Sequence, residues 1–274
     1  MTAITTSTGP FTYRESGHKL AAHDSSGLKS GDLRPWPLLL AVPYTAYAVA
    51  VFTVISLLLV LAVLLLPGMA MRRQVAHQAS RLFLWLAGYR LRLLHAENLP
   101  EGPCIVVANH ASYIDGPVMK AALPPRFGFV IKREMDGVPL AGLMLRRIGS
   151  QFVERKQTRA GARDALRVLR AAAQGASLGF FPEGTFAPEP GLLRFHSGAF
   201  VTAVKAGCPV VPCVIRGTRR ALPPDGSWPR PGLIEVELTP PLTSSADDPV
   251  TDLRQRARRA ILARLDEPDL HPED

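Results

Sequence analysis

The residues best suited to chemistry in this sequence are a histidine and an aspartate five positions apart. His110 and Asp115 lie in the segment N-H-A-S-Y-I-D-G, which directly follows an apolar run at 104–108. A carboxylate that bonds one imidazole nitrogen orients the ring and leaves the other nitrogen free to accept a proton. The spacing therefore predicts a general base with its orienting acid. A capping box, with Ser112 as the N-cap of a helix and Asp115 three residues later, fits the same residues.

Two further segments place polar residues after apolar runs. F-P-E-G-T at 181–185 sets one acid in a tight turn of Pro and Gly, and we expect Glu183 and the amide of Gly184 to point outward. G-S-Q-F-V-E-R at 149–155 ends on Arg155 after a short apolar strand, and an arginine binds phosphate through paired hydrogen bonds. An ordinary β-turn and a solvated arginine are the alternatives for these two segments.

The elements that must position these residues alternate between strands and helices. Apolar runs predict strands at 90–95, 104–108, 127–132, 178–181, 210–215 and 234–238. Helices are expected at 113–122, 140–148, 159–174, 198–206 and 250–265. Alternation of this kind predicts an α/β fold with a mostly parallel sheet flanked by helices. In such sheets, sites form where strands end and helices begin.

Composition narrows the classes of function. The 274 residues include 32 Lys and Arg against 23 Asp and Glu, a net charge of +9 that suits anionic lipid, phosphorylated substrates or nucleic acid. The basic residues are scattered and an apolar segment precedes them, which argues against nucleic acid. Three cysteines without C-x-x-C spacing exclude a disulfide framework, and the seven histidines show no H-x-x-x-H spacing, so no metal is implied.

An uncharged segment near the N-terminus predicts a transmembrane helix. No charged residue occurs at 35–71, and the apolar part at 38–66 would form a helix of roughly 44 Å, longer than the ~30 Å hydrocarbon core. Its length and position exclude a cleaved signal peptide. A long buried core helix is the alternative. Aromatic residues at its start, Trp36, Tyr44 and Tyr47, suit a membrane interface.

The sequence divides into three parts on this basis. We expect a mobile tail at 1–34, a transmembrane anchor at 35–67 and a catalytic domain at 68–268 that begins with an amphipathic helix at 69–88. Arginines of that helix are expected near an anionic membrane surface, with its large apolar residues in the interface: Arg72, Arg73, Arg81, Leu82, Phe83, Trp85 and Leu86. The excess of positive charge after the anchor places the domain on the cytoplasmic side.

Taken together, these segments resemble the conserved blocks of the glycerolipid acyltransferase family, and most closely its bacterial 1-acylglycerol-3-phosphate acyltransferases. The pattern N-H-x-x-x-x-D is met at 109–115, G-x-x-x-[FV]-x-R at 149–155 and F-P-E-G-T at 181–185, and the V-P-V block corresponds to 210–212. Order and spacing agree, and the resemblance extends over about 70–240. The first and third patterns together are highly specific.

The resemblance implies a membrane-bound acyltransferase. It would move a fatty acyl group from acyl-CoA or acyl-carrier protein to the free hydroxyl of lysophosphatidic acid, giving phosphatidic acid. Both donors are co-substrates, and no cofactor is implied. His110 would be the general base and Asp115 would hold its tautomer. The residues implied in acceptor binding are Glu183, Gly184 and Thr185, with Arg155 on the phosphate and Lys132 as a second candidate for it.

Some alternatives stay open on the sequence alone. Phe186 follows F-P-E-G-T where many members have Arg, so the acceptor could be another lysophospholipid, lyso-ornithine lipid or glycerol 3-phosphate. A basic membrane-binding protein on the same scaffold is the non-enzymatic alternative, and such a protein has no use for a base paired with an acid. The implied location is the cell membrane.

Overall fold

A seven-stranded sheet forms the centre of the protein in the computed structural model, which describes residues 38–154, 159–225, 228–243 and 249–272. The predicted tail at 1–34, Trp36 and Arg155 lie outside these residues. The strands are β1 (Tyr89–Leu94), β2 (Ile105–Ala108), β3 (Gly128–Lys132), β4 (Gln151–Val153), β5 (Leu178–Phe180), β6 (Val210–Arg216) and β7 (Gly232–Leu238).

The strand order is β1-β7-β6-β2-β5-β3-β4, and every neighbouring pair is parallel except β6 and β7. Five adjacent strands therefore point the same way, and the carboxyl ends of β6, β2, β5, β3 and β4 share one edge of the sheet. The prediction of a mostly parallel sheet flanked by helices is confirmed.

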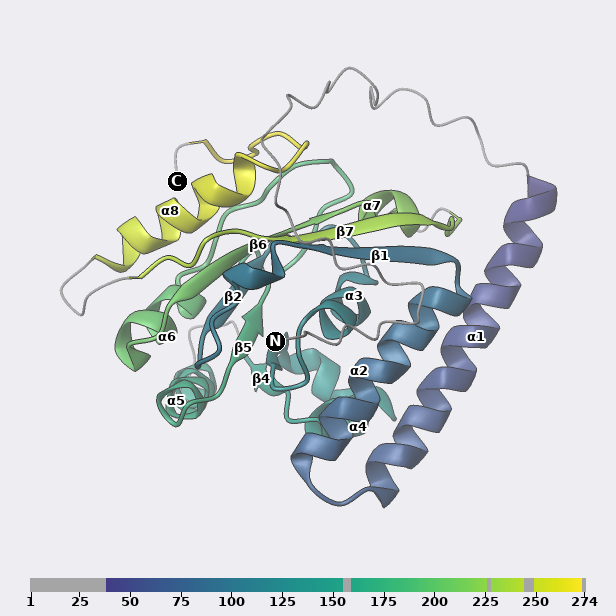
Figure 1. Cartoon of the computed structure of the whole chain (residues 1–274), viewed down its shortest axis with the longest axis horizontal. Helices are drawn as coiled ribbons and strands as arrows, with labels where there is room; N and C mark the ends of the chain where they lie inside the picture. The colour runs from purple at the N-terminus through teal and green to yellow at the C-terminus, as the bar shows by residue number, and fades with distance from the viewer. Residues whose placement is uncertain (1–37, 155–158, 226–227, 244–248, 273–274) are drawn as a thin grey trace, which may run out of the picture.

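Helices cover both faces of this sheet (Figure 1). The helices are α1 (Leu38–Leu65), α2 (Met69–Leu86), α3 (Asp115–Ala122), α4 (Ala141–Arg147), α5 (Arg159–Ala173), α6 (Gly198–Ala206), α7 (Thr218–Ala221) and α8 (Val250–Leu262). Side chains of β2 alternate between the two faces. Ile105 and Val107 pack among residues of α6 and α8, whereas Val106 packs among residues of α2 and α3. The sheet is therefore buried on both sides, which explains its continuous apolar strands.

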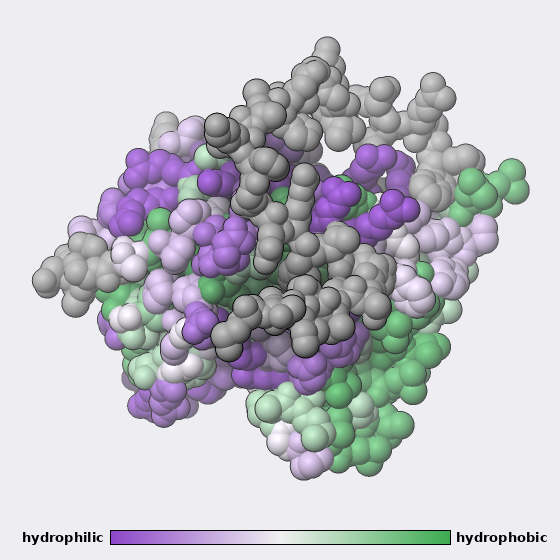
Figure 2. All heavy atoms as spheres, viewed as in Figure 1, coloured by the Kyte–Doolittle hydropathy of each residue, from purple (hydrophilic) through white to green (hydrophobic). Residues whose placement is uncertain are grey.

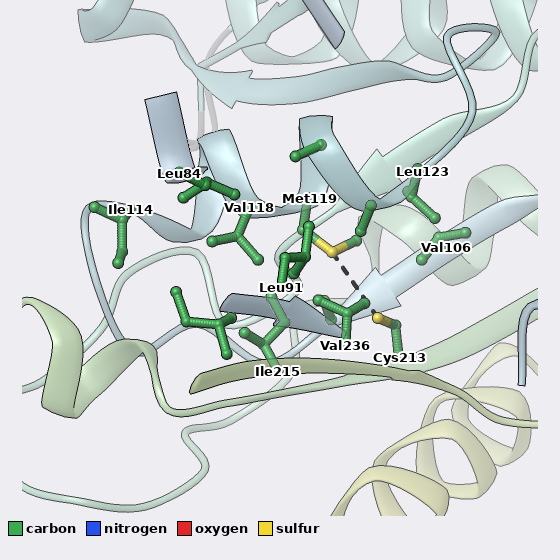
Figure 3. Packing of buried hydrophobic residues seen from close by; sticks show 14 of the residues in the cluster. Leu84, Leu91, Val106, Ile114, Val118, Met119, Leu123, Cys213, Ile215 and Val236 are labelled. Carbon is green, nitrogen blue, oxygen red and sulfur yellow. Dashed lines mark hydrogen bonds between the residues drawn. The ribbon is translucent and has the colours of Figure 1, made fainter. Parts of the chain in front are cut away.

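The core between α3 and the sheet is built from buried apolar side chains that pack against one another (Figure 3). Met119 of α3 lies against Cys213 of β6, with 3.9 Å between their sulfur atoms. Cys104 and Cys208 are buried as well, and burial raises the pKa of the Cys104 thiol to about 11. The three buried thiols are therefore packing residues.

Helices α1 and α2 form an antiparallel hairpin beside the domain (Figure 1). Gly68 turns the chain between them with φ of +74°, a conformation that favours glycine. Phe52 of α1 packs edge-on against Phe83 of α2, with 5.4 Å between ring centroids. The Tyr44 hydroxyl donates to the carbonyl of Ala87 at 2.7 Å and so satisfies the C-terminal end of α2.

The outer face of α1 is largely apolar, above all over its C-terminal two thirds (Figure 2). Only 11 % of its most apolar 18-residue stretch is buried, and by length and composition the helix is able to cross a membrane. Apolar residues along it are half or more exposed, including Leu39, Phe52, Leu57 and Leu61. An exposed apolar surface of this length marks a membrane-associated protein.

The polar face of α2 differs from the prediction. Arg73 donates to the carbonyls of Ile148 (3.0 Å) and Arg126 (2.9 Å), so the expectation that it faces anionic lipid is wrong. His77 is buried, and its Nδ1 lies 2.9 Å from the Lys120 carbonyl oxygen. These side chains join α2 to the ends of distant elements, a long-range role that helical periodicity does not reveal.

The apolar face of α2 is divided between core and surface. Phe83 is 7 % exposed, whereas Leu82 and Trp85 are 46 % and 52 % exposed. Leu82 and Trp85 therefore stay available to a membrane interface, and Phe83 belongs to the core beneath α1.

Candidate active site

Residues far apart in the sequence meet at the shared carboxyl edge of the sheet. His110 follows β2, Glu183 follows β5 and Lys132 ends β3. Strands β2 and β5 are hydrogen-bonded neighbours, and β5 also pairs with β3. The topology therefore brings the segments singled out from the sequence to adjacent strand ends.

His110 and Asp115 are in direct contact. The imidazole Nδ1 lies 2.7 Å from Oδ2 of Asp115, whose side chain is fully buried. The same Oδ2 accepts the backbone N–H groups of Ala111 (2.7 Å) and Ser112 (2.8 Å), which fixes the carboxylate beneath the turn. A carboxylate accepts hydrogen bonds, so Nδ1 carries the ring proton and Nε2 keeps its lone pair. The His110 side chain is 19 % exposed, so the ring is partly accessible.

The capping-box alternative accounts for only part of this geometry. Ser112 donates its hydroxyl to the carbonyl of Leu222 (2.7 Å), while the Asp115 backbone N–H donates to the Ser112 carbonyl (3.2 Å). Helix α3 begins at Asp115, three residues after Ser112. The Ser112 hydroxyl also accepts the Ile114 N–H at 3.4 Å but bonds no N–H group within α3, and the carboxylate has the imidazole as an additional partner.

Aromatic rings enclose the imidazole. Phe181 stacks on the His110 ring with 4.3 Å between centroids, and Phe186 meets it edge-on at 4.6 Å. Tyr113, which is 69 % exposed, contacts the outer side of Phe186 at 4.8 Å. These contacts fix the plane of the imidazole and make its surroundings apolar.

Glu183 faces inward, so the expectation that it points outward with the Gly184 amide is wrong. Its Oε1 accepts the backbone N–H of His110 (2.6 Å), and its Oε2 accepts that of Leu193 (2.8 Å). The Gly184 N–H donates to the carbonyl of Phe181 at 3.0 Å and closes the turn. The reason lies in the topology, because β2 ends beside β5 and offers an unpaired N–H at its terminus.

Burial dominates the ionisation of Glu183. The side chain is 3 % exposed, and loss of solvent raises the pKa of its carboxyl group to about 8 despite the two amide donors. The geometry makes Glu183 the link between the turn at His110 and the loop that contains Leu193.

Asn109 is a contributor whose role the sequence did not reveal. Its amide nitrogen donates to the Ile215 carbonyl (3.0 Å), and its oxygen accepts the Ile215 N–H (2.7 Å). The side chain thus continues the pairing of β2 with β6 beyond the end of β2. Its position directly after an apolar strand and before His110 could have indicated this role, because a buried asparagine needs hydrogen-bond partners for both its amide nitrogen and its amide oxygen.

The residues expected to bind the acceptor are spread along the edge. Lys132 is half exposed and lies 3.1 Å from the carboxylate of Glu134. Thr185 is exposed, and its hydroxyl reaches only the neighbouring Phe186 carbonyl at 3.5 Å. Arg155 lies outside the described residues. No group of three or more His, Cys, Asp or Glu side chains in the described ranges has a metal-binding arrangement.

Comparisons with known proteins identify the family. A family model named Acyltransferase matches residues 90–216. The 1-acyl-sn-glycerol-3-phosphate acyltransferase of Pseudomonas aeruginosa is 30 % identical over 200 residues, which cover 70 % of this chain and 77 % of that protein. The human 1-acyl-sn-glycerol-3-phosphate acyltransferase alpha is 33 % identical over 219 residues, which cover 75 % and 76 % of the two chains. The chain belongs to the 1-acyl-sn-glycerol-3-phosphate acyltransferase family.

Other members differ in length. The chloroplastic 1-acyl-sn-glycerol-3-phosphate acyltransferase BAT2 of Brassica napus is 31 % identical over 157 residues, which cover 56 % of this chain and 45 % of that protein. The crystal structure of the 1-acyl-sn-glycerophosphate acyltransferase from Thermotoga maritima superposes with a TM-score of 0.68 at 21 % identity, over 82 % of this chain and 96 % of that one. The fold is therefore that of a 1-acyl-sn-glycerol-3-phosphate acyltransferase.

Membership in the 1-acyl-sn-glycerol-3-phosphate acyltransferase family decides between the two classes left open by the sequence. The protein is an acyltransferase, and the non-enzymatic membrane-binding alternative is set aside.

Proposed function

We propose that this acyltransferase acylates lysophosphatidic acid to phosphatidic acid at the carboxyl edge of β2. The observation that carries the proposal is the contact of His110 with Asp115, at a strand end that Glu183 fixes from the neighbouring strand. The names of the relatives from Pseudomonas aeruginosa and human support the acceptor.

The reaction follows from the orientation of the imidazole. With its proton on Nδ1 and bonded to Asp115, His110 accepts the proton of the acceptor hydroxyl at Nε2. The hydroxyl oxygen bonds to the carbonyl carbon of the thioester, the C–S bond breaks, and the proton passes to the departing thiolate. Asp115 stabilises the imidazolium that exists between the two proton transfers. No acyl-enzyme intermediate forms, so no nucleophilic serine or cysteine is needed.

The acceptor lies along the edge formed by β5, β3 and β4 in this proposal. Lys132 and Arg155 are its cationic candidates for the phosphate, because each follows or ends a strand of that edge in the sequence. Glu183 contributes by fixing the turn around His110. Thr185 is exposed at the same turn and contacts the polar part of the acceptor.

Acyl-CoA and acyl-carrier protein both fit as donors of the thioester. The alternative acceptors are another lysophospholipid, lyso-ornithine lipid and glycerol 3-phosphate. Phe186 gives a reason to test them, because an aromatic ring and not a cation contacts His110 at this position.

The decisive experiment measures transfer of a labelled acyl group by the purified full chain. Lysophosphatidic acid, lysophosphatidylcholine, lyso-ornithine lipid and glycerol 3-phosphate are compared as acceptors, each with acyl-CoA and with acyl-carrier protein. We expect phosphatidic acid as the main product, formed about 10² to 10⁴ times more slowly by the His110→Ala variant. Faster acylation of any other acceptor in the panel than of lysophosphatidic acid contradicts the proposed substrate.

The membrane anchor at 35–67 belongs to the same proposal. Insertion of α1 explains its exposed apolar face, and the proposed topology keeps the catalytic domain at 68–268 in the cytoplasm, with the anionic membrane surface beside α2. Substitution of two exposed residues, Leu57→Lys with Leu61→Lys, should release the protein from vesicles in a flotation assay. The matched control, Ala165→Lys with Leu166→Lys on exposed positions of α5, should still float.

The side of the membrane is tested separately. Glu189 is exposed, and a Glu189→Cys variant offers an accessible thiol beside three buried ones. A membrane-impermeant maleimide should label it in broken cells and not in intact cells. Labelling in intact cells contradicts the cytoplasmic placement.

A further inference from the structure

The last described segment of the chain lies across the loop that follows the Glu183 turn. We call residues 267–270 the C-terminal strap and residues 186–193 the site loop. The backbone N–H of Leu192 donates to the Pro268 carbonyl (2.9 Å), and that of Leu270 donates to the Leu192 carbonyl (3.2 Å). Strap and site loop therefore pair like two short parallel strands.

A glycine in the site loop allows this close approach. Gly191 has φ of +147°, and a Cβ atom there would clash with the side chain of Leu270. The strap therefore packs against a position that has no side chain, which indicates a specific fit and not a loose terminal segment.

One ion pair clamps strap and site loop together. Glu267 accepts hydrogen bonds from Arg219 Nε (2.9 Å) and Nη2 (3.1 Å), and also from the Gly191 backbone N–H (2.8 Å). Arg219 extends the clamp by donating to the Ala187 carbonyl at 2.8 Å. Both side chains are largely shielded from solvent, at 16 % and 21 % exposure, so the pair is more than a surface contact.

A second, deeper pair anchors the strap to α8. Arg258 is 4 % exposed and donates to the Asp269 carboxylate, with 2.6 Å between Nη1 and Oδ2. Its guanidinium lies over the ring of Phe195, 6.0 Å from the centroid. A buried arginine bonded in this way holds its acid in one place.

These contacts continue to the catalytic turn without a break. Leu193, next to the residue that pairs with the strap, donates its N–H to Oε2 of Glu183, and Oε1 of the same carboxylate holds the His110 N–H. Phe186, at the start of the site loop, packs against the His110 ring.

We propose that the C-terminal strap is a positioning element of the acyltransferase, in which Glu267 and Arg219 set the site loop so that Glu183 and Phe186 hold His110 in its reactive orientation. The inference rests on the proposed function for its kinetic consequence. Neither the strap nor Arg219 lies within residues 90–216 that match the family model, so this is a property of the present chain beyond that match.

The test compares Glu267→Gln with Asp252→Asn in the full chain. Each replaces one acid of an ion pair by its amide, and the Asp252 pair with Arg256 (3.6 Å) lies on the exposed side of α8. We expect Glu267→Gln to lower kcat by on the order of tenfold, which is less than the loss from a full 1 Å misplacement of reacting groups. KM for both substrates should stay within about twofold, and kcat of Asp252→Asn should equal that of the wild type.

Two further variants separate positioning from a general loss of folding. Glu267→Asp keeps the charge and should recover part of kcat. The double variant of Arg219→Lys with Glu267→Gln should be no slower than the slower single variant, because the two side chains act as one unit. The proposal is overturned if the loss of kcat in the double variant equals the product of the losses in the two single variants. It is also overturned if Glu267→Gln leaves kcat unchanged.

A measurement without substrate distinguishes this inference from the proposed function. Hydrogen exchange followed by mass spectrometry should show faster exchange in peptides that contain His110 and Leu193 for Glu267→Gln, and not for Asp252→Asn. This result supports the strap even if lysophosphatidic acid is not the acceptor. Unchanged exchange in both peptides of Glu267→Gln overturns the proposed positioning role of the strap, even if the acyl transfer is confirmed.

Discussion

Two clusters of polar side chains lie at opposite ends of α3, where Asp115 is the first residue and Lys120 lies in the last turn, and they differ in what their hydrogen bonds reach. The site cluster consists of His110, Asp115 and Glu183, whose carboxylates accept backbone N–H groups of neighbouring turns. The hairpin cluster consists of Arg73, His77 and Lys120, whose side chains contact backbone carbonyl oxygens below α2.

The difference lies in the atom that remains free. In the site cluster, His110 Nε2 has no hydrogen-bond partner among the described residues, and the ring is partly exposed. In the hairpin cluster, Arg73 uses its guanidinium on carbonyls of three residues, and Lys120 is 7 % exposed. The site cluster therefore keeps one accessible nitrogen for chemistry, whereas the side chains of the hairpin cluster join elements by bonding backbone carbonyl groups.

The largest expected effect comes from a comparison of the partly exposed His110 with the buried His77. His110→Ala should lower kcat by about 10² to 10⁴, the usual contribution of a general base, with little change in Tm. His77→Ala should lower Tm and leave the kcat of the folded fraction within about twofold. Steady-state kinetics and thermal unfolding of both variants give the test. Equal kinetic losses in the two variants contradict the assignment of chemistry to the site cluster alone.

The variant Asp115→Asn has the second largest expected effect on catalysis. An amide no longer fixes the proton on His110 Nδ1, so we expect kcat to fall by about 10²-fold. A residue that only caps α3 would instead cost about 1 kcal/mol of stability and leave turnover intact. Comparing kcat with the free energy of unfolding in urea distinguishes the two roles.

Glu183→Gln should have a smaller kinetic effect, about tenfold on kcat, because it acts on the backbone of His110. Its pH signature is distinct. Burial raises the pKa of Glu183 from 4.5 to about 8, so between these values the folded state keeps a proton that the unfolded state has lost. The wild type therefore loses stability as pH rises from about 5 to 8, and the variant does not. Urea titrations across this pH range should show that the free energy of unfolding of the variant rises relative to that of the wild type. A difference that stays constant with pH contradicts the raised pKa of Glu183.

Lys120→Met should have the smallest effect on catalysis and should stabilise the protein. Burial, with Arg73 nearby, lowers the pKa of Lys120 from 10.5 to about 8, so the charged form is unfavourable in the folded state. We expect a gain of about 1 to 2 kcal/mol at pH 7, with kcat within twofold. The gain should shrink as pH rises from 8 to 10.5, because the folded lysine is then neutral. Unfolding at pH 7 and pH 10 provides the measurement.

The sequence was informative where the geometry is local. His110 and Asp115 are five residues apart on one strand-to-helix turn, so their contact follows from the spacing. The apolar strands, and the polar residues that follow their carboxyl ends, are also visible in short-range sequence patterns. One example is β4, which ends directly before Glu154.

It was uninformative where the partner lies far along the chain. Whether Glu183 points outward or inward depends on the end of β2, 73 residues earlier. The burial of Arg73 depends on the carbonyl of Ile148, 75 residues later. The clamp between Arg219 and Glu267 spans 48 residues and has no periodic signature.

The pairing of β1 with β7 sets an order of assembly during synthesis. β1 is an edge strand, and its neighbour in the sheet begins 143 residues later, where Tyr89 lies opposite Gly232. At a ribosomal rate of about 5 to 20 residues per second, β1 waits roughly 7 to 29 seconds for its partner. Helices α1 and α2 are complete long before that moment, so the hairpin meets the lipid bilayer while the sheet beside it still lacks its edge. Glu267 follows β7 in the chain, so under the proposed role of the strap the catalytic turn is clamped only after the whole sheet has been synthesised.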